Sequence, residues 1–299
     1  MFKNAIIYRI GTLAATLDQA EAALQRARFI ECGPTQEKSV GFVPPRGEAH
    51  GALVESIGGQ WICRLMVETK SVPGDALRRA TQAHADQVEQ ETGRKPGKKE
   101  RRELQGDALL ELLPHAFARS AATWIWIDRL ASTLLIDTGS QARADEVASL
   151  LVELLSGLTV ALLGTQTSPQ AAMAHWLVEQ EPPQGFSVDR ECELKAADES
   201  RAVVRYGHHP LDIAEISAHI EAGKLPTRLA LTWDDRVSFV LTDGLQVRKI
   251  AFLDSVFDGR KEDDAGFDAD VAIATGELAK LIPDLVGALG GHARAVDPS

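Results

Sequence analysis

Cysteine is scarce in this chain. The 299 residues include three cysteines, Cys32, Cys63 and Cys192, which lie far apart in the sequence. An odd count without a C-x-x-C pair argues against a disulfide framework and against a zinc site. We therefore expect all three cysteines to be small apolar residues of the core.

Long uninterrupted apolar runs are also missing. Residues 147–164 form the most apolar region, but Glu153 and the Ser156-Gly157 pair interrupt it. This favours a helix followed by a strand over a membrane span. The first ten residues hold a short apolar run without a small-residue cleavage site, so no signal peptide is predicted. We expect a cytoplasmic protein that has no membrane partner.

Recognised catalytic motifs are absent as well. The sequence has no P-loop, no G-x-S-x-G, no H-E-x-x-H and no G-x-G-x-x-G. Aspartates at predicted hairpin ends are where a nuclease would hold Mg²⁺, but aspartate is also a common turn former; they are Asp128, Asp137, Asp235 and Asp243. The acidic tract at 254–270 lacks EF-hand spacing and is interpreted as a solvated loop. We expect no catalytic residue, no metal and no cofactor.

Positive charge is outnumbered overall but concentrated in one place. The chain has 32 Lys and Arg against 43 Asp and Glu, yet residues 94–102, RKPGKKERR, hold six cations: Arg94, Lys95, Lys98, Lys99, Arg101 and Arg102. An acidic body repels duplex DNA, so binding would require that cations be segregated on one surface. Because cations at a helix N-terminus oppose the helix dipole, helix stability does not explain the cluster. A solvated corner and a phosphate-contacting arm are the two interpretations.

Hydrophobic patterning predicts an α+β protein built from four segments. Residues 1–73 are strand-rich. Residues 74–115 form a helical pair, about 75–91 and 99–113, whose thin apolar stripes indicate projecting helices with little burial. The cluster RKPGKKERR occupies the corner between these two helices.

The other two segments mix helices and strands. Residues 116–210 begin with the predicted hairpin TWIWIDRLASTLLIDTG and continue through a helix at 141–156. Residues 211–299 begin with a helix that we expect Asp212 to cap, followed by a β-meander at 228–254. A terminal helix is predicted from about Thr275, with a bend at Pro283.

Three further positions are candidates for binding. Phe117 is a large apolar residue just past a predicted helix end, between His115 and Arg119. It is either a core residue or an exposed interface anchor. His208 and His209 form the one adjacent histidine pair of the sequence. Two adjacent histidines make a poor metal site without a third ligand, so we interpret them as surface or interface residues.

Nine short motifs, in order and spread over the full length, resemble the recombination-associated proteins of the RdgC family. They are F-K-N with Y-R (2–4 and 8–9), C-G (32–33), G-F-V-P-P (41–45), L-L-P-H-A-F (112–117), W-I-D (126–128), Q-G-F (184–186), H-I-E-A-G-K (219–224), F-D-A-D (267–270) and T-G-E-L (275–278). The resemblance implies an α+β protomer with mixed or antiparallel sheets, shaped like a horseshoe. It also implies that two protomers join head to head and tail to tail into a dimeric ring around duplex DNA.

The resemblance also implies roles for individual residues. The segment 94–102 matches a basic family segment that faces DNA, and we assign Arg119 to the same surface. Phe117 matches an aromatic residue at the interface where the ring opens, beside His115, which replaces a family arginine. His208 and His209 stand where a Lys-Gln pair is familiar, and we assign them to the dimer interface at the other end.

We therefore expect a homodimeric, nucleoid-associated ring that binds double-stranded DNA without sequence preference and restrains the RecA recombinase. Proteins of this kind are not known as enzymes. A ring can carry acid outside and base inside, so the net charge of −11 does not argue against DNA binding. The alternatives are a Mg²⁺-dependent nuclease and a regulator that grips RecA directly without DNA.

Overall fold

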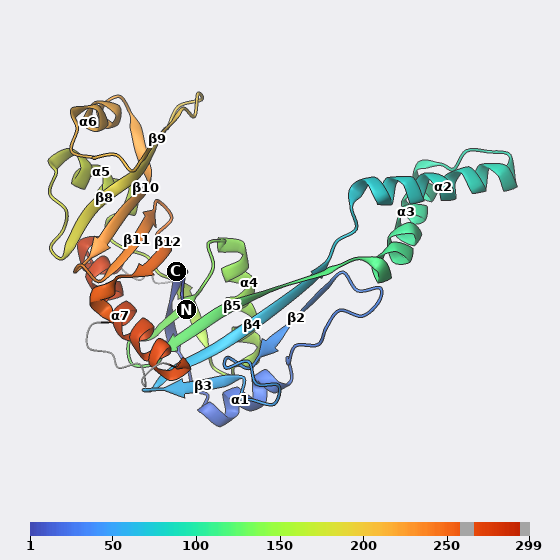
Figure 1. Ribbon diagram of the computed structural model, residues 1–299, viewed down its shortest axis with the longest axis horizontal. Coiled ribbons are helices and arrows are strands. Elements are labelled where there is room, and N and C mark those ends of the chain that lie inside the picture. Colours follow the sequence, from blue (N-terminus) through green and yellow to red (C-terminus); the bar gives the residue numbers. More distant parts are fainter. Residues whose placement is uncertain (258–265, 294–299) are drawn as a thin grey trace, which may run out of the picture.

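The protein is built around one large antiparallel sheet, seen in a computed structural model that describes residues 1–257 and 266–293 (Figure 1). The strands of this part are β1 (Asn4–Thr12), β2 (Lys38–Val43), β3 (Val54–Ile57), β4 (Gln60–Lys70), β5 (Ala118–Asp128), β6 (Thr133–Ile136), β7 (Thr159–Leu162), β8 (Phe186–Ala196), β9 (Val203–Gly207), β10 (Lys224–Trp233), β11 (Val237–Thr242) and β12 (Val247–Phe252). The helices are α1 (Leu17–Gln25), α2 (Gly74–Thr92), α3 (Lys98–Leu112), α4 (Gln141–Leu154), α5 (Pro169–Glu179), α6 (Ala214–Glu221) and α7 (Phe267–Ala288), with short 3-10 turns η1 (Leu113–His115) and η2 (Asp254–Val256). The predicted α+β class is confirmed.

The sheet has two halves that meet at a narrow junction. Its strand order is β2-β4-β5-β6-β1-β12-β11-β10-β8-β9, with β3 beside β4 and β7 beside β1. The halves join where β1 pairs with β12 through two residue pairs, Asn4 with Arg248 and Ala5 with Val247. The first and last of the four predicted segments are thus bonded directly to each other. The division into four segments itself stays a prediction.

Two apolar clusters stabilise the sheet from opposite sides. One lies under α1 and α4 and includes the fully buried Leu24, Phe42 and Ile125. The other extends across the junction, from Trp126 in the first half to Trp233 in the second, and α7 covers it. Burying one such large side chain contributes about 1.5–3 kcal/mol, so this second cluster holds the two halves together.

The predicted projecting helical pair is confirmed. Strands β4 and β5 stay paired from Trp61 and Ile127 out to Lys70 and Ala118, and they carry α2 and α3 beyond the body (Figure 1). Ala85 is the buried residue of α2, and Ala108 that of α3. We call residues 74–115 the arm. The two helices bury little apolar surface. Their packing against each other therefore depends on these small residues and on the paired strands β4 and β5 that carry them.

The hairpin predicted at 123–139 is confirmed by β5 and β6, which together extend from 118 to 136. The predicted helix followed by a strand is confirmed by α4 and β7, and the β-meander by β10 to β12. The terminal helix was predicted to begin too late. It begins at Phe267, because the Phe267 ring packs under the Arg46 guanidinium at 4.9 Å and beside the Trp124 ring at 6.1 Å. Arg46 also pairs with Asp268 at 2.6 Å, so tertiary contacts stabilise two more turns than the sequence pattern indicated.

Two smaller expectations are wrong. Asp212 does not cap α6; Ile213 is the N-cap residue, without a side-chain bond. Cys32 is only half-buried, with its backbone N–H donating to the Glu68 carboxylate at 2.7 Å, whereas Cys63 and Cys192 are buried. The strand-rich first segment is confirmed by β1 to β4, and it also contains α1, which begins with a capping box of Thr16 and Gln19.

Within the described residues, none of the helices combines the length and the apolar character that a membrane crossing requires.

One ion pair fastens α7 to the sheet and provides a test of the junction. Arg236 donates two hydrogen bonds to the Glu277 carboxylate, at 2.6 and 2.7 Å, and the Glu277 side chain is only 8% exposed. Hydrogen bonding from Arg236 lowers the pKa of Glu277. A carboxyl whose pKa is lowered by folding stabilises the protein above its unfolded pKa, and this contribution is lost as the pH falls through the folded value.

We predict that Glu277→Gln lowers the free energy of unfolding by about 2 kcal/mol at pH 7, because the neutral amide replaces a carboxylate that accepts two hydrogen bonds from the charged Arg236 side chain. Urea unfolding monitored by tryptophan fluorescence measures this loss. The difference between the variant and the parent should shrink below about pH 4.3, where the parent's carboxyl becomes protonated in the unfolded chain. Glu153→Gln, the same substitution at an exposed glutamate of α4 that forms no ion pair within the described residues, is the control; an equal loss in both variants would contradict the prediction.

Candidate nucleic-acid interface

The predicted basic cluster lies at the corner of the arm, where the chain turns from α2 into α3. Gly93 ends α2 with a positive φ of 72°, which glycine adopts without strain. The Glu100 carboxylate accepts two hydrogen bonds from Arg94, at 2.8 and 3.3 Å, and one from the backbone N–H of Gly97. Hydrogen bonding from Arg94 lowers the pKa of Glu100, so the first turn of α3 carries an anion that offsets part of the cationic charge.

The six cations of the cluster are not equivalent. Arg94 is paired with Glu100, Lys99 lies 3.9 Å from Glu103, and Arg101 donates to Gln82 at 2.7 Å. Within the described part of the chain, the other three have no ion pair and no side-chain hydrogen bond; they are Lys95, Lys98 and Arg102. All three are exposed. These three side chains are the ones free to contact a phosphate.

Phe117, His115 and Arg119 lie at the root of the arm rather than at its corner. The fifteen residues of α3 separate the two places, a rise of about 22 Å. Phe117 is 91% exposed, so the core interpretation of this residue is wrong and the exposed one stands. Arg119 is exposed on β5 opposite Thr69, and His115 is exposed in η1. A large apolar ring in water between two basic side chains is typical of an interface anchor.

His208 and His209 lie at the opposite end of the molecule, after β9 (Figure 1). Both are exposed, and His208 adopts a positive φ of 55°. The His209 ring lies 6.0 Å from the Tyr206 ring, and its Nδ1 is 2.7 Å from the carbonyl oxygen of Pro210. The structure therefore does not bring the histidine pair together with the arm residues.

The open face of the second half-sheet carries cations that sequence reasoning missed. In β8 and β10 the residues alternate, so that Cys192, Leu194 and Leu229 face the core while Glu193, Lys195 and Arg228 face solvent. Arg205 pairs with Glu193 at 2.6 Å, and Lys249 with Glu191 at 2.6 Å. Lys195 and Arg228 form no ion pair among the described residues, although Arg228 lies opposite Glu193 in the ladder, where the hydrogen bond from Arg205 and the charge of Arg228 lower the pKa of that carboxyl. Residues 191–195, ECELK, alternate strictly between polar and apolar side chains, and this pattern could have identified the solvent-facing side of β8 from the sequence.

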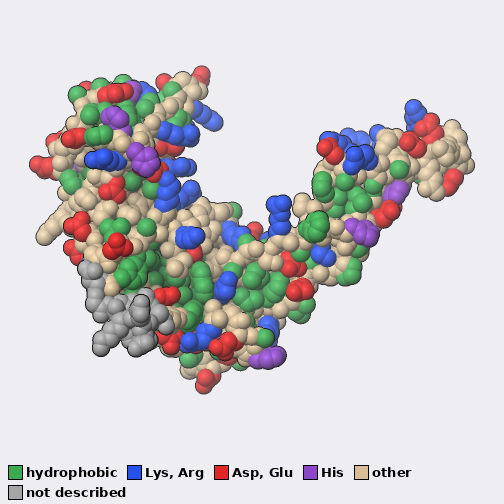
Figure 2. All heavy atoms as spheres, viewed as in Figure 1, with side chains coloured by type: hydrophobic (Ala, Val, Ile, Leu, Met, Phe, Trp, Pro, Cys, Tyr) green, Lys and Arg blue, Asp and Glu red, His purple; other side chains and the backbone are tan. Residues whose placement is uncertain are grey.

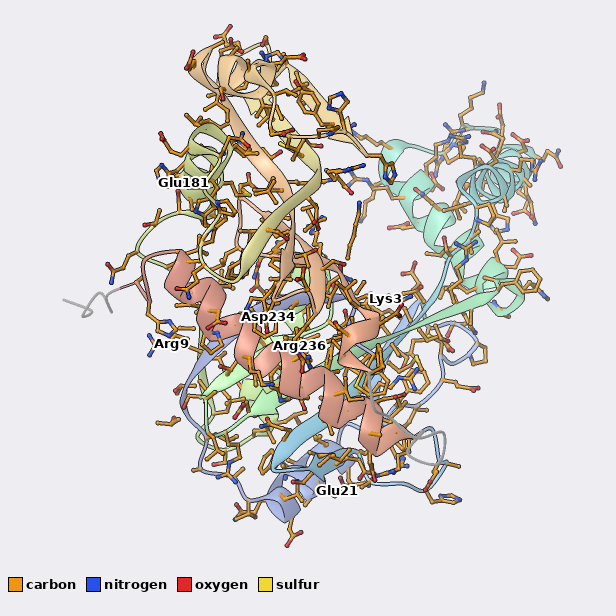
Figure 3. All side chains as sticks on the ribbon, turned by 60° about the vertical axis from the view of Figure 1, so that its left-hand side comes forward. Lys3, Arg9, Glu21, Glu181, Asp234 and Arg236 are labelled. Carbon is orange, nitrogen blue, oxygen red and sulfur yellow. The ribbon has the colours of Figure 1, made fainter. Side chains whose placement is uncertain are left out.

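The arm and the second half-sheet flank a broad hollow (Figure 2). Helices α5 and α6 cover the far side of the second half-sheet, so its open face is directed toward the arm (Figure 1). Figure 2 shows Lys and Arg side chains along both borders of the hollow, whereas Asp and Glu are more frequent on the outer border of the left-hand lobe. Figure 3 shows Lys3 on the side of the body that faces the arm. Lys3 is held there because its N–H and that of Asn4 donate to the Asp137 carboxylate, at 3.1 and 2.8 Å.

We use the name basic walls for the exposed cations without an ion pair, within the described residues, on the elements that border this hollow: Lys95, Lys98 and Arg102 on the arm, Lys195 and Arg228 on the second half-sheet, and Lys3 on the body. Cations spread over a concave surface attract a polyanion that fits between them, while contacts to phosphates carry no base information. The arrangement is therefore suited to binding the backbone of a nucleic acid rather than to reading its sequence.

Two of the four hairpin aspartates have structural roles. Asp128 accepts hydrogen bonds from the backbone N–H groups of Leu130 and Ala131, and burial raises the pKa of Asp137, which tethers β1. Residues 1–257 and 266–293 contain no group of three or more His, Cys, Asp and Glu side chains placed to hold a metal ion. Part of the acidic tract, 258–265, lies outside the described residues.

Comparisons with known proteins cover the whole chain. Residues 1–292 match the family model described as "Putative exonuclease, RdgC". The "Recombination-associated protein RdgC" of Dechloromonas aromatica is 43% identical over 299 residues, covering 97% of this chain and 98% of the relative. Those of Herminiimonas arsenicoxydans and Bordetella pertussis are 41% and 40% identical, each covering at least 97% of both chains. The chain belongs to the RdgC family of recombination-associated proteins.

Proposed function

We propose that this protein binds duplex DNA without sequence preference, inside a ring formed by two copies of the chain, and thereby restrains RecA-dependent recombination in the nucleoid. The observation that carries the proposal is the placing of exposed cations, which form no ion pair within the described residues, on the basic walls of a protein whose net charge is −11. Each cation that neutralises a phosphate releases a counterion, which supplies affinity without base contacts.

The ring is supported by the placing of the predicted interface residues. Phe117 lies at the root of the arm and His208-His209 lie at the other end of the molecule (Figure 1). Two contact regions at the two ends of a curved protomer allow a second copy to close a ring through symmetric contacts. The relatives' name associates them with recombination, and we propose that competition with RecA for the same DNA is how this chain acts on recombination.

We predict that Lys95→Gln/Lys98→Gln lowers the affinity for every duplex about equally. A plot of log affinity against log salt should become shallower by roughly 0.9 for each phosphate that the variant no longer neutralises, because fewer counterions are released. Fluorescence anisotropy with two labelled duplexes of unrelated sequence, between 50 and 200 mM salt, measures both effects. Gln is a good helix former, so the arm stays folded.

The matched control removes the same charge elsewhere. Arg26→Gln/Lys280→Gln changes two exposed cations on the body, after α1 and on α7, that are not part of the basic walls. This double variant should keep the parent's salt slope. Equal salt slopes in the parent and the arm variant would refute the role of the arm in DNA binding. A flattened salt slope in the control would show that the slope depends on the net charge of the protein and not on the position of the cations.

Phe117→Ala should weaken closure of the ring while leaving the fold intact. Truncating an anchor that fills a partner's pocket typically costs 2 kcal/mol or more of binding energy, whereas an exposed side chain contributes little to folding. Sedimentation velocity as a function of concentration, together with retention on covalently closed plasmid at high salt, measures the effect. A lowered melting temperature with unchanged retention would mean that Phe117 supports the fold instead.

The two alternative functions are tested directly. The family description names an exonuclease, so end-labelled linear duplex and supercoiled plasmid are incubated with the protein and Mg²⁺. We expect both substrates to stay intact, since we propose a binding protein rather than an enzyme. Shortening of the linear duplex or nicking of the plasmid, without the same activity in a mock purification from cells carrying the empty vector, would establish the nuclease. A regulator that acts only on RecA would bind RecA and show no affinity for bare duplex.

A further inference from the structure

An apolar cavity of about 140 Å³ lies between β1, the β5–β6 turn and α7. Its lining includes Ile7, Leu163, Ile282 and Val286. A dry cavity of roughly 150 Å³ lined by such side chains accommodates a benzene ring. This one therefore has the size for one aromatic or branched aliphatic side chain.

The mouth of the cavity is cationic. Arg9 and His292 line it and are exposed, and no ion pair or side-chain hydrogen bond of Arg9 is present among the described residues. The acid that also lines the cavity, Asp128, is 4% exposed. Its Oδ1 accepts the N–H groups of Leu130 and Ala131, both at 2.9 Å, and its Oδ2 accepts from Gln60 at 3.3 Å. Asp128 is thus occupied, and Arg9 is left to pair with an anion from outside.

The turn beside the cavity presents a second apolar group. Leu130 is 94% exposed, although Asp128 holds its backbone and Ser132 accepts the Ile10 N–H at 2.7 Å. A side chain presented on a rigid turn binds a partner with little loss of conformational entropy.

Beyond the turn lies an open groove of about 550 Å³, lined by Leu13, Trp61 and Arg129 among others. The Arg129 guanidinium lies 4.8 Å from the centre of the Trp61 ring. The groove lies on the opposite face of the sheet from the cavity, because Ile10 and Trp61 belong to the apolar cluster under α1 and α4, and the two linings meet at Ser132 in the turn. A small free acid would use the cavity alone, whereas an extended peptide that passes round the turn would contact the cavity, Leu130 and the groove.

We propose that this surface binds an acidic, extended peptide segment of a partner protein. One large apolar side chain of the segment enters the cavity, and its carboxylates pair with Arg9 and Arg129. Figure 3 shows Arg9 and Lys3 on opposite sides of the body, so the peptide surface is separate from the basic walls. Peptide and duplex can therefore be bound at the same time, and the proposal does not rest on the proposed DNA function.

The test is fluorescence anisotropy with a labelled acidic pentapeptide that ends in phenylalanine, titrated with the full-length protein. We expect saturable binding that weakens at least tenfold when the terminal phenylalanine is replaced by alanine. Arg9→Gln should lower the affinity about tenfold, the factor that one charge-assisted hydrogen bond contributes. Ala279→Leu should remove binding, because Ala279 lines the cavity and a larger side chain there fills it. Circular dichroism and thermal melting establish that both variants are folded.

Matched variants separate this surface from the basic walls. Lys280→Gln, one position from Ala279 but outside the cavity lining, should bind the peptide like the parent. Lys95→Gln/Lys98→Gln should also keep peptide binding, and Arg9→Gln should keep duplex binding. Loss of peptide binding in the arm variant, or equal affinity for the phenylalanine and alanine peptides, would overturn the proposal. Binding seen only with a variant that ends at Ala293 would assign the cavity to the protein's own last residues and would overturn it as well.

Discussion

The arrangement of this protein depends on the pairing of β1 with β12. Two residue pairs make the sheet continuous between its halves, and without them the arm and the open face of β8–β12 would have no fixed relation. Two residue pairs are too few to hold the two halves of the sheet together by themselves. The cluster that extends from Trp126 to Trp233 includes Ala5 and Val247 of the junction itself, and α7, α5 and α6 contribute the residues that cover it. The Arg236–Glu277 and Arg46–Asp268 pairs then fix α7 to both halves.

The distribution of ion pairs gives an acidic protein a cationic hollow. Many Lys and Arg side chains are neutralised by neighbours, as Arg205 is by Glu193 and Lys249 by Glu191. Exposed pairs of this kind contribute little to stability, so their main effect is on the surface potential. Cations that form no ion pair with the described residues, such as Lys95 and Arg228, belong to the arm and the second half-sheet, the two elements that border the hollow (Figure 2). Charge counted over the chain therefore says less about binding than charge counted over one surface.

Much of this could be predicted from residue patterns. The weak apolar stripes of α2 and α3, with Pro and Gly between them, indicated a projecting helical pair, because such helices cannot bury a face. Alternation and turn residues indicated the hairpin at 118–136 and the β-meander. The nine motifs indicated the family. By contrast, the start of α7 at Phe267 could not be predicted, because the ring is held by Arg46 and Trp124, which are distant in the sequence.

The sequence by itself determined the class, the family and the presence of an exposed basic corner, since all three depend on local periodicity and short motifs. Only the tertiary structure decided that Phe117 is exposed, that Arg46 is engaged by Asp268, 222 residues further along the chain, and that Lys195 and Arg228 lie on the open face of the second half-sheet. The physical reason is that exposure and pairing are properties of distances between side chains. Strands that lie more than a hundred residues apart in the sequence set those distances when they join one sheet.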